Sequence, residues 1–327
     1  MQSSARGLVR TDLALEAREA LLQEARGEVA GVNSTTRTTA HTRVTKVKVT
    51  SEAGARRLGK PPGTYITIEA PELRQGSRVV ASETAEVLAQ ELGRLANLPE
   101  KASILVIGLG NWNATPDALG PRVVDAVMVT RHLFEYAPQE LKGGLRSVAA
   151  LAPGVLGVTG IETEEIVKGV VERINPDLVV AVDALAARSL ERVCTTVQLT
   201  DTGIHPGSGI GNKRLGLTEQ SLGVRVIGVG VPTVIHATTL ASDALGLLLG
   251  RLENTGSESG GNLGRIFSPA ERERLVHKLL PGQWEDLFIT PKEIDALIVD
   301  MARVLASGLN AALHPGINSA EGERYLQ

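Results

Sequence analysis

Two aspartates follow apolar runs of the kind that form buried strands. Asp117 comes a short loop after "SILVIGLG" (103–110), and Asp183 ends the run "PDLVVAVD" (176–183). In an open parallel sheet, ligands bind beyond the carboxyl ends of the strands, so we expect both carboxylates at that edge. One ionised and one protonated carboxyl group, held together, can activate water and protonate a carbonyl oxygen. The two residues are therefore candidates for acid–base hydrolysis.

The surroundings of the two acids favour different protonation states. "TPDALG" resembles a helix start with Thr115 as the cap, and the positive end of a helix favours an ionised Asp117. Asp183 follows five apolar residues, and desolvation there favours a protonated carboxyl group. Each acid also has a purely structural interpretation. Asp117 could simply cap its helix, and Asp183 could cap a helix formed by "ALAARS" or pair with Arg188.

The Gly-x-Gly segments of the chain do not fit a nucleotide site. A dinucleotide-binding loop needs a third glycine three residues after the second, and those positions hold Asn113, Asn212 and Thr233. The segment "HPGSGIGNKR" contains Lys213, but it lacks the glycine before and the Ser or Thr after this lysine that a P-loop requires. The glycines therefore serve turns or a groove rather than a phosphate.

Other catalytic arrangements fit the sequence poorly. The six histidines are too widely spaced for a zinc-binding helix, and the chain has neither a cysteine pair nor a Gly-x-Ser-x-Gly elbow. Cys194, the only cysteine, lies in the strand-like run "RVCTTVQL", which favours a buried, inert thiol. His205 in "TGIHPGSG" could donate to a substrate carbonyl, and a loop histidine without that role is the alternative.

Composition predicts a globular protein of the cell interior. Of the 327 residues, 43% are hydrophobic and 22% charged, and the net charge is −3 with both signs interspersed. No basic surface indicates nucleic acid, and a single cysteine suits a reducing compartment. We see no signal-peptide-like stretch and no apolar run that approaches a membrane span. We therefore expect a cytoplasmic protein that binds neither nucleic acid nor membrane.

The elements that must position these residues alternate along the chain. "RVTKVKVT" and "TYITIEA" alternate as an antiparallel pair does, after a polar stretch, "GVNSTTRTTAHTR", that we expect to be a flexible connection. Four apolar runs then alternate with helical segments, which predicts an α/β domain with a largely parallel or mixed sheet covered on both faces. The predicted helices span 11–26, 82–97, 116–136, 162–174, 234–250, 269–280 and 291–313, and we expect a mobile loop at 253–264.

Several long segments resemble, in order, the germination proteases of spore-forming bacteria. They are "VRTDLALEA", "GLGNWNATPDALGP", "VTRHLF", "APGVLGVTGIET", "NPDLVVAVDALAARSLERV", "TDTGIHPGSGIGNKR", "GVPTVIHATTLASD" and "TPKEIDALIVDMARVLASGLNAALH". The resemblance covers nearly the whole chain. It implies a phosphorylase/hydrolase-like α/β fold, similar to the hydrogenase-maturation proteases, with an N-terminal β-hairpin region.

The resemblance implies an atypical aspartic endopeptidase without a cofactor or metal. Such enzymes degrade the small, acid-soluble proteins of dormant spores at germination and are made as tetrameric zymogens that process themselves. The family's proposed catalytic aspartates fall on Asp117 and Asp183. We expect the two glycine loops and nearby polar groups to bind substrate: Gly108, Gly110, Asn111, His205, Gly207, Gly209 and Asn212.

The resemblance also implies a processing site near the N-terminus. "DLALE" (12–16) imitates the family's substrates, which are cut between an acidic residue and a large apolar one. We therefore predict self-cleavage between Asp12 and Leu13, a propeptide of residues 1–12 and a single peptidase domain of residues 13–327. The alternative is that Thr11 or Asp12 only caps the helix that begins there.

Two other functions remain open on sequence grounds. Hydrogenase-maturation proteases also place Gly-x-Gly-Asn before an acid, and there the acids hold a metal, so chelation separates that interpretation from an aspartic peptidase. A non-catalytic protein could instead hold peptides in the glycine-rich groove, and peptide turnover separates it from either enzyme. One departure from the family pattern is His236, which stands in "PTVIHA" where an acid is expected.

Overall fold

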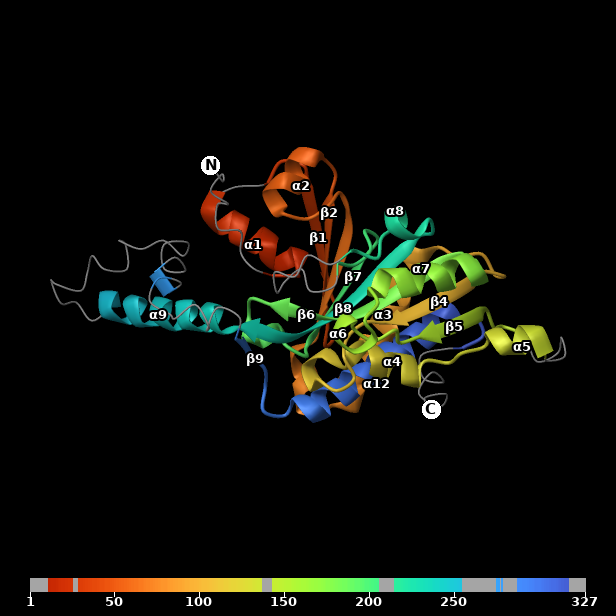
Figure 1. The fold of residues 1–327 in the computed structure, drawn as a ribbon. Coiled ribbons are helices and arrows are strands. Elements are labelled where there is room, and N and C mark those ends of the chain that lie inside the picture. The colour runs from red at the N-terminus through yellow and green to blue at the C-terminus, as the bar shows by residue number, and fades with distance from the viewer. Residues whose placement is uncertain are drawn as a thin grey trace.

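The computed structural model describes most of the chain. The described residues are 11–25, 29–136, 143–205, 215–254, 275–276, 278 and 287–317. Within them, all strands join one mixed sheet with helices on both faces, which confirms the predicted α/β class (Figure 1). Most of the predicted helix 269–280 and of the loop 253–264 lies outside the described residues, as do Gly207, Gly209 and Asn212.

One half of the sheet is parallel, as predicted. The full strand order is β1-β2-β3-β7-β8-β6-β4-β5, with β9 paired to β8, and β8, β6, β4 and β5 run parallel to one another. The bounds are β1 (Val32–Thr38), β2 (Arg43–Val49), β3 (Gly63–Glu69), β4 (Ser103–Gly108), β5 (Ser147–Leu151), β6 (Leu178–Ala187), β7 (Thr196–Thr200), β8 (Val226–His236) and β9 (Phe288–Ile289). Continuous Val, Ile and Ala runs suit β4, β6 and β8 because both of their faces are covered.

The other half of the sheet is antiparallel and carries the N-terminal strands. β2 and β3 form the predicted antiparallel pair, and β3 continues the sheet by pairing with β7. The predicted flexible connection is wrong in part, because residues 32–38 form the edge strand β1 opposite β2. Its threonines have high strand propensity, and seven register pairs with β2 give them a ladder.

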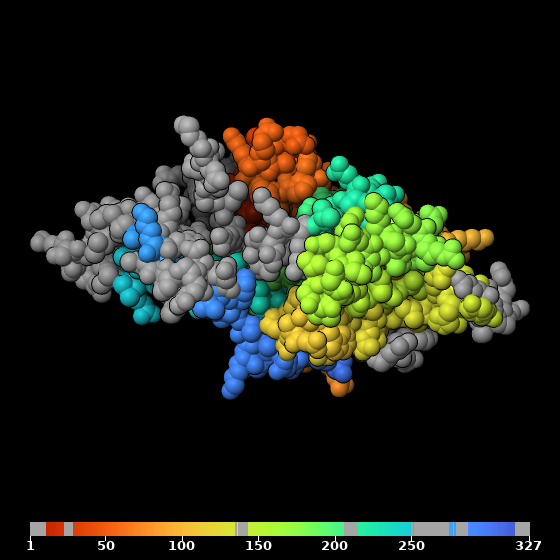
Figure 2. Space-filling model, viewed as in Figure 1, coloured from red at the N-terminus to blue at the C-terminus, as the bar shows by residue number. Residues whose placement is uncertain are grey.

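The helices form two layers. On one face lie α3, α4 and α12; on the other lie α7 and α8, while α1 and α2 pack over the N-terminal strands (Figure 1). Their bounds are α1 (Ala14–Ala25), α2 (Glu52–Leu58), α3 (Arg78–Ala96), α4 (Leu119–Ala126), α5 (Arg131–Tyr136), α6 (Leu156–Thr159), α7 (Thr163–Ile174), α8 (Glu219–Leu222), α9 (Ala237–Asn254) and α12 (Ile294–Leu313). Short 3₁₀ turns are η1 (Pro71–Gln75), η2 (Thr115–Asp117) and η4 (Leu190–Arg192). The α2 region forms the orange projection at the top of Figure 2, above α7 in light green.

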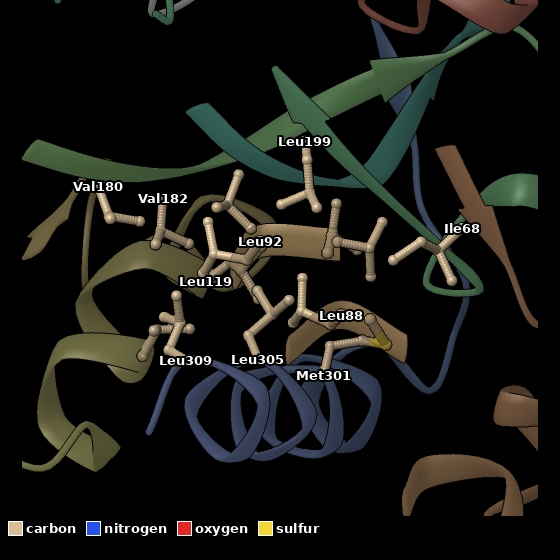
Figure 3. Close-up of a cluster of buried hydrophobic side chains, with 14 of the residues drawn as sticks. Ile68, Leu88, Leu92, Leu119, Val180, Val182, Leu199, Met301, Leu305 and Leu309 are labelled. Carbon is tan, nitrogen blue, oxygen red and sulfur yellow. The ribbon is translucent and has the colours of Figure 1, made fainter. Parts of the chain in front are cut away.

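The main core lies between the sheet and the layer formed by α3, α4 and α12. Figure 3 shows Leu88 and Leu92 of α3 meeting Leu305 and Leu309 of α12 beneath Val182 of β6. All five side chains are fully buried. Each such side chain contributes about 1.5–3 kcal/mol when it leaves water. This layer therefore fixes β6 and β4 from below and leaves the carboxyl ends of the two strands to the functional site.

Helix α12 corrects our expectation about membrane-length runs. It is long and apolar enough to cross a membrane by length and composition, although 67% of its apolar window is buried inside the protein. Its contacts with α3 and α4 make it the central helix of the core. A core helix that is covered on most sides is apolar all round, so hydropathy alone does not separate it from a span.

Two predicted helices have different bounds in the structure. Residues 116–136 divide into η2, α4 and α5, because α4 ends at Ala126 with Val127 already extended. The segment 234–250 begins as strand, since β8 continues to His236 and α9 starts only at Ala237. The β-branched run "VPTVI" favours the longer strand, and its pairing with β6 as far as Ile235 holds it.

Candidate active site

The loop after β4 closes tightly on Asp117. Gly110 has φ +117°, and a Cβ placed on it would lie 1.9 Å from the carbonyl oxygen of Asp117. The Asp117 carboxylate accepts a hydrogen bond from the backbone N–H of Asn111 through Oδ2, at 2.8 Å. Asp117 itself ends η2, whose second residue is Pro116, and Thr115 is part of that turn rather than its cap. The loop thus holds the carboxylate by its own backbone.

Gly108 serves packing and does not line the site. A Cβ on Gly108 would lie 2.2 Å from the carbonyl oxygen of Gly120, and one on Gly120 would lie 2.2 Å from that of Leu109. The two glycines let the first turn of α4 approach the end of β4. Gly108 is not among the residues that line the cavity, and its contact with substrate stays a prediction.

Asp183 lies within β6 rather than at its end. The strand continues to Ala187, so residues 184–187 of "ALAARS" are strand, and the alternative that Asp183 caps a helix there is wrong. The neighbouring strand β4 does stop at this level, with Gly108 opposite Val182. Asp183 is 5% exposed, and its Oδ1 accepts a hydrogen bond from Ala184 N at 2.9 Å. The guanidinium of Arg188 lies 3.3 Å from Asp243.

Both aspartates line one cavity of about 410 Å³. Its walls come from the loop after β4, from the start of α7 and from β6 beyond Asp183. The lining side chains and backbone include Gly110, Asn111, Asp117, Asp183, His205 and Phe288. The cavity thus lies beyond the carboxyl end of β4, as the sequence predicts, and beside the last residues of β6 rather than beyond its end. Its volume lies in the range of small-molecule and peptide-side-chain sites.

His205 borders this cavity as a neutral donor or acceptor. Desolvation lowers the pKa of its imidazole, and the charge of Lys60 lowers it further. Gly216 makes room for the ring, since a Cβ there would lie 2.5 Å from the His205 Cδ2. A neutral imidazole at this wall can donate one hydrogen bond and accept another.

His236 supports the cavity wall from behind. Its side chain is buried, and its ring packs against Phe288 with 4.8 Å between the centroids. Phe288 in turn lines the cavity. The histidine therefore acts on the site through an aromatic contact.

The predicted processing site forms part of the same cavity. Asp12 lines it, and the backbone of Asp12 pairs with β6 by donating to the Ala186 carbonyl oxygen at 3.0 Å. The Asp12 Oδ2 accepts from Ala186 N at 2.9 Å. Leu13 and Ala14 are fully buried. Sequence reasoning predicted a cleavable segment but not that this segment is docked beside Asp183.

A buried acid secures the segment on its other side. Glu16 is 3% exposed and accepts from the backbone N–H groups of Arg188 and Ser189 at 2.7 and 3.0 Å. Thr11 donates its hydroxyl to Glu16 and accepts from Leu13 N, and both contacts lie before α1 begins at Ala14. Arg192 contacts Glu16 at 3.4 Å.

Two residues of this region escaped the sequence analysis, Lys60 and Gln198. Both contact the backbone of Asp12. A signal exists for Gln198, because an amide within the strand-like run "TTVQLT" must find buried partners. Lys60 lies in "GKPPG", which indicates only a turn.

The described residues offer little to a metal ion. Across the described ranges, no group of three or more His, Cys, Asp or Glu side chains is arranged to hold one. Cys194 is buried, and burial raises the pKa of its thiol to about 12, in agreement with the inert thiol that we predicted.

Comparison with known proteins identifies one family over nearly the whole chain. The model of the germination protease family matches residues 9–261 and 261–326. The chain is 48% identical to a germination protease of Caldanaerobacter subterraneus over 97% of this chain and 98% of that relative. It is 46% identical to one from Clostridium perfringens, over 97% and 99%, and 42% identical to one from Bacillus cereus, over 97% and 96%.

Proposed function

The chain belongs to the germination protease family and is therefore a peptidase of spore germination that acts on protein, and we propose that Asp117 and Asp183 are its catalytic pair. One observation carries this assignment. Asp117, from the loop and turn after β4, and Asp183, from the adjacent parallel strand β6, line one cavity at the side of the sheet where α/β proteins bind ligands.

The proposed reaction is hydrolysis of a peptide bond without a covalent intermediate. One carboxylate takes a proton from water, and the resulting hydroxide adds to the peptide carbonyl carbon. The other carboxyl group protonates the carbonyl oxygen. The C–N bond then breaks, the amine nitrogen takes up a proton, and the acyl part leaves as a carboxylic acid.

We propose small, acid-soluble spore proteins as the substrates and the cytoplasm of the forespore and spore core as the enzyme's location. The support is the segment "DLALE", which resembles the family's cleavage sites and lies docked at the cavity. We further propose that the enzyme is a zymogen. It would cut itself between Asp12 and Leu13, release residues 1–12 and retain residues 13–327 as one domain.

We also propose a homotetramer, and α9 supports this. The helix extends away from the sheet at one end of the molecule (Figure 1). Leu240, Leu247 and Leu248 are 40%, 72% and 57% exposed. Their spacing of seven and eight residues puts them on one side of the helix. An exposed apolar stripe of this kind suits contact between subunits.

The test of the catalytic pair uses two isosteric variants. Asp117→Asn and Asp183→Asn should each fold and lose turnover of spore-protein substrate by at least roughly 10²-fold, because the acid or base is gone. The control is Asp125→Asn on α4, which should keep wild-type turnover. Near wild-type turnover in Asp117→Asn or Asp183→Asn removes that residue from the mechanism.

Chelation separates the aspartic mechanism from a metal-dependent one. The purified enzyme should retain its turnover after exhaustive dialysis against a chelator. Loss of turnover that a single divalent ion restores would establish the metal-dependent alternative. Peptide binding without any turnover, under all these conditions, would establish the non-catalytic binder.

A further inference from the structure

The carbonyl oxygen of Asp12 is held by two side-chain donors. Lys60 donates from Nζ to this oxygen at 2.9 Å, and Gln198 donates from Nε2 at 3.1 Å. Lys60 also donates to the carbonyl oxygen of Thr11 at 3.2 Å. Two convergent donors on one peptide oxygen form the arrangement that stabilises negative charge during acyl transfer.

Gln198 also grips the chain on the far side of Leu13. Its Oε1 accepts a hydrogen bond from Ala14 N at 2.8 Å. One amide side chain therefore spans the Asp12–Leu13 peptide bond, with its donor on the Asp12 carbonyl and its acceptor two residues later. Together with the two hydrogen bonds between Asp12 and Ala186, this fixes the peptide in one orientation.

The sheet register brings this peptide to the level of the catalytic pair. Gly230 of β8 lies opposite Asp183 of β6 and also opposite Gln198 of β7. Partners in register on neighbouring strands project to the same face. Asp183 and Gln198 thus share a face, two strand spacings or about 10 Å apart between their backbones. Asp12 lines both the 410 Å³ cavity and a smaller one of about 70 Å³ beside Lys60, so water has room on this face.

We propose that Lys60 and Gln198 bind the oxyanion formed when the Asp12–Leu13 bond is hydrolysed. The proposal rests on the self-processing proposed above. As the oxygen of water adds to the Asp12 carbonyl carbon, the pair of electrons of the C=O bond moves to the oxygen that Lys60 and Gln198 hold. In this self-cleavage the two donors take the place of the carboxyl group that protonates the carbonyl oxygen of other protein substrates. When the C–N bond breaks, that electron pair returns, Leu13 N leaves as an amine with a proton from water, and Asp12 keeps the hydroxyl group.

The electrostatics of Lys60 suit this role. Desolvation lowers the pKa of its ammonium group, while the carboxylates of Asp12 and Glu16 oppose that shift. A donor that has already lost water needs little reorganisation when charge develops on its acceptor. The positive charge of the ammonium form gains most in the step that makes the oxyanion.

The test measures the rate at which the full-length chain loses residues 1–12. Intact mass and N-terminal sequencing follow conversion from the precursor to a chain that begins at Leu13. Lys60→Met removes one donor, and Gln198→Glu removes the other while it keeps an acceptor for Ala14 N. Each should slow conversion by roughly 10²-fold, the usual effect of losing one oxyanion donor. Lys60→Arg, which retains donors, should recover part of the rate.

Tyr65→Phe is the matched control. Tyr65 lines the same small cavity, but its hydroxyl donates to Pro61 O at 2.9 Å and accepts from the Thr202 hydroxyl at 3.3 Å. The variant should convert at the wild-type rate. Thermal unfolding of each variant identifies any that have lost the fold. If Lys60→Met is one of them, the conversion rates of Lys60→Arg and Gln198→Glu are compared with the wild-type rate instead.

The outcomes separate this proposal from the one on which it rests. If no product that begins at Leu13 forms under any condition in which the wild-type chain digests protein, self-processing is wrong, and so is the proposed role of Lys60 and Gln198. If the wild-type chain converts and Lys60→Met and Gln198→Glu convert equally fast, self-processing stands and only the proposed oxyanion binding by Lys60 and Gln198 is wrong. Slow conversion of both Lys60→Met and Gln198→Glu, with conversion of Tyr65→Phe at the wild-type rate, establishes that Lys60 and Gln198 bind the oxyanion.

Discussion

Gly110 positions Asp117 through a close approach that a side chain would block. Its φ is +117°, and a Cβ on it would lie only 1.9 Å from the Asp117 carbonyl oxygen, which leaves no space for alanine. Gly110→Ala should therefore move the carboxylate, and a displacement of about 1 Å costs about 10²-fold in rate. Turnover of a spore-protein substrate measures this loss.

Gly76→Ala is the control for that variant. Gly76 also has positive φ, at +71°, but a Cβ there meets nothing within 4 Å. Alanine should cost about 1 kcal/mol of stability through backbone strain and leave turnover unchanged. Equal turnover in both alanine variants would show that the Gly110 contact does not place Asp117.

Tyr65 predicts a loss of stability at high pH. It is 3% exposed, and burial raises its pKa from 10.0 to about 12. Above pH 10 the unfolded chain loses the phenolic proton while the folded chain keeps it. The free energy of unfolding should therefore fall by about 1.4 kcal/mol per pH unit until the folded phenol also ionises near pH 12. Urea unfolding at pH 10 and 11.5 measures this fall.

The difference between wild type and Tyr65→Phe isolates that contribution from the titration of lysines. The variant lacks the phenol, so its stability should fall less steeply over the same range. Parallel curves for the two proteins would remove Tyr65 as the cause.

At this scale the sequence predicted the acids better than their partners. Asp117 and Asp183 stand out because charges that follow apolar runs are rare. Lys60 and Gln198 lie far from them in the chain and reach the site only through the pairing of β3, β7 and β8. No local pattern predicts such a pairing.

Arg192 fastens α1 to the body of the protein. Its guanidinium contacts Glu19 at 2.7 Å, Glu69 at 3.0 Å and the buried Glu16 at 3.4 Å. The three carboxylates raise the pKa of the guanidinium, which stays charged. Removing one partner of a buried ion pair leaves the other unpaired, so Arg192→Met should lower the free energy of unfolding by about 3 kcal/mol.

Denaturant unfolding measures that cost, and Arg94→Met is the control. Arg94 pairs with Glu91 at 2.8 Å on the surface of α3, where its side chain is 65% exposed. Glu91 itself is buried but keeps Arg37 as a second partner at 2.8 Å, so the loss of the exposed Arg94 should cost only about 0.5 kcal/mol. Equal losses in the two variants would mean that the Arg192 cluster does not anchor α1.

The hydrophobic pattern of the sequence predicts some helix and strand boundaries well and others poorly. The apolar runs predicted β4, β6 and β8 because continuous burial on both faces leaves a plain signal. The signal is poorer for residues 32–38, because the edge strand β1 has the polar composition that is typical of loops. It is also poorer at 184–187, where small residues suit helix and strand alike and pairing with β8 decides.

All strands of the described residues belong to one sheet, which joins the N-terminal strands to the strands that carry the candidate site. The N-terminal hairpin region joins this sheet because β3 pairs with β7 over five residues, which brings α1 to the catalytic face. The prediction of a single α/β domain after Asp12 stays a prediction. The sequence contains the strands, but contacts between residues 65–69 and 196–200 depend on the folded chain.

The proposed tetramer predicts a variant that assembles poorly. Leu247→Asp with Leu248→Asp places two charges on the exposed side of α9, which should dissociate subunits that meet there because a buried charge is costly. Sedimentation equilibrium measures the mass. Val79→Asp, at a site that is 66% exposed on α3, is the control and should keep the wild-type mass. An unchanged mass in the α9 variant would exclude this helix from the interface.

Because Asp12 is hydrogen-bonded to Ala186 beside the cavity, the activity of the cut enzyme should depend on its dilution. In the proposed zymogen, Asp12 meets the cavity, while its bond to Leu13 is intact, at the millimolar effective concentration that a short tether provides. Once that bond is cut, the released peptide becomes a free ligand, and its occupancy follows its bulk concentration. Freshly cut enzyme should therefore gain activity when it is diluted, whereas uncut enzyme should not. In the proposed zymogen, the intact Asp12–Leu13 bond thus keeps Asp12 at the cavity, and cleavage of that bond allows the released peptide to dissociate.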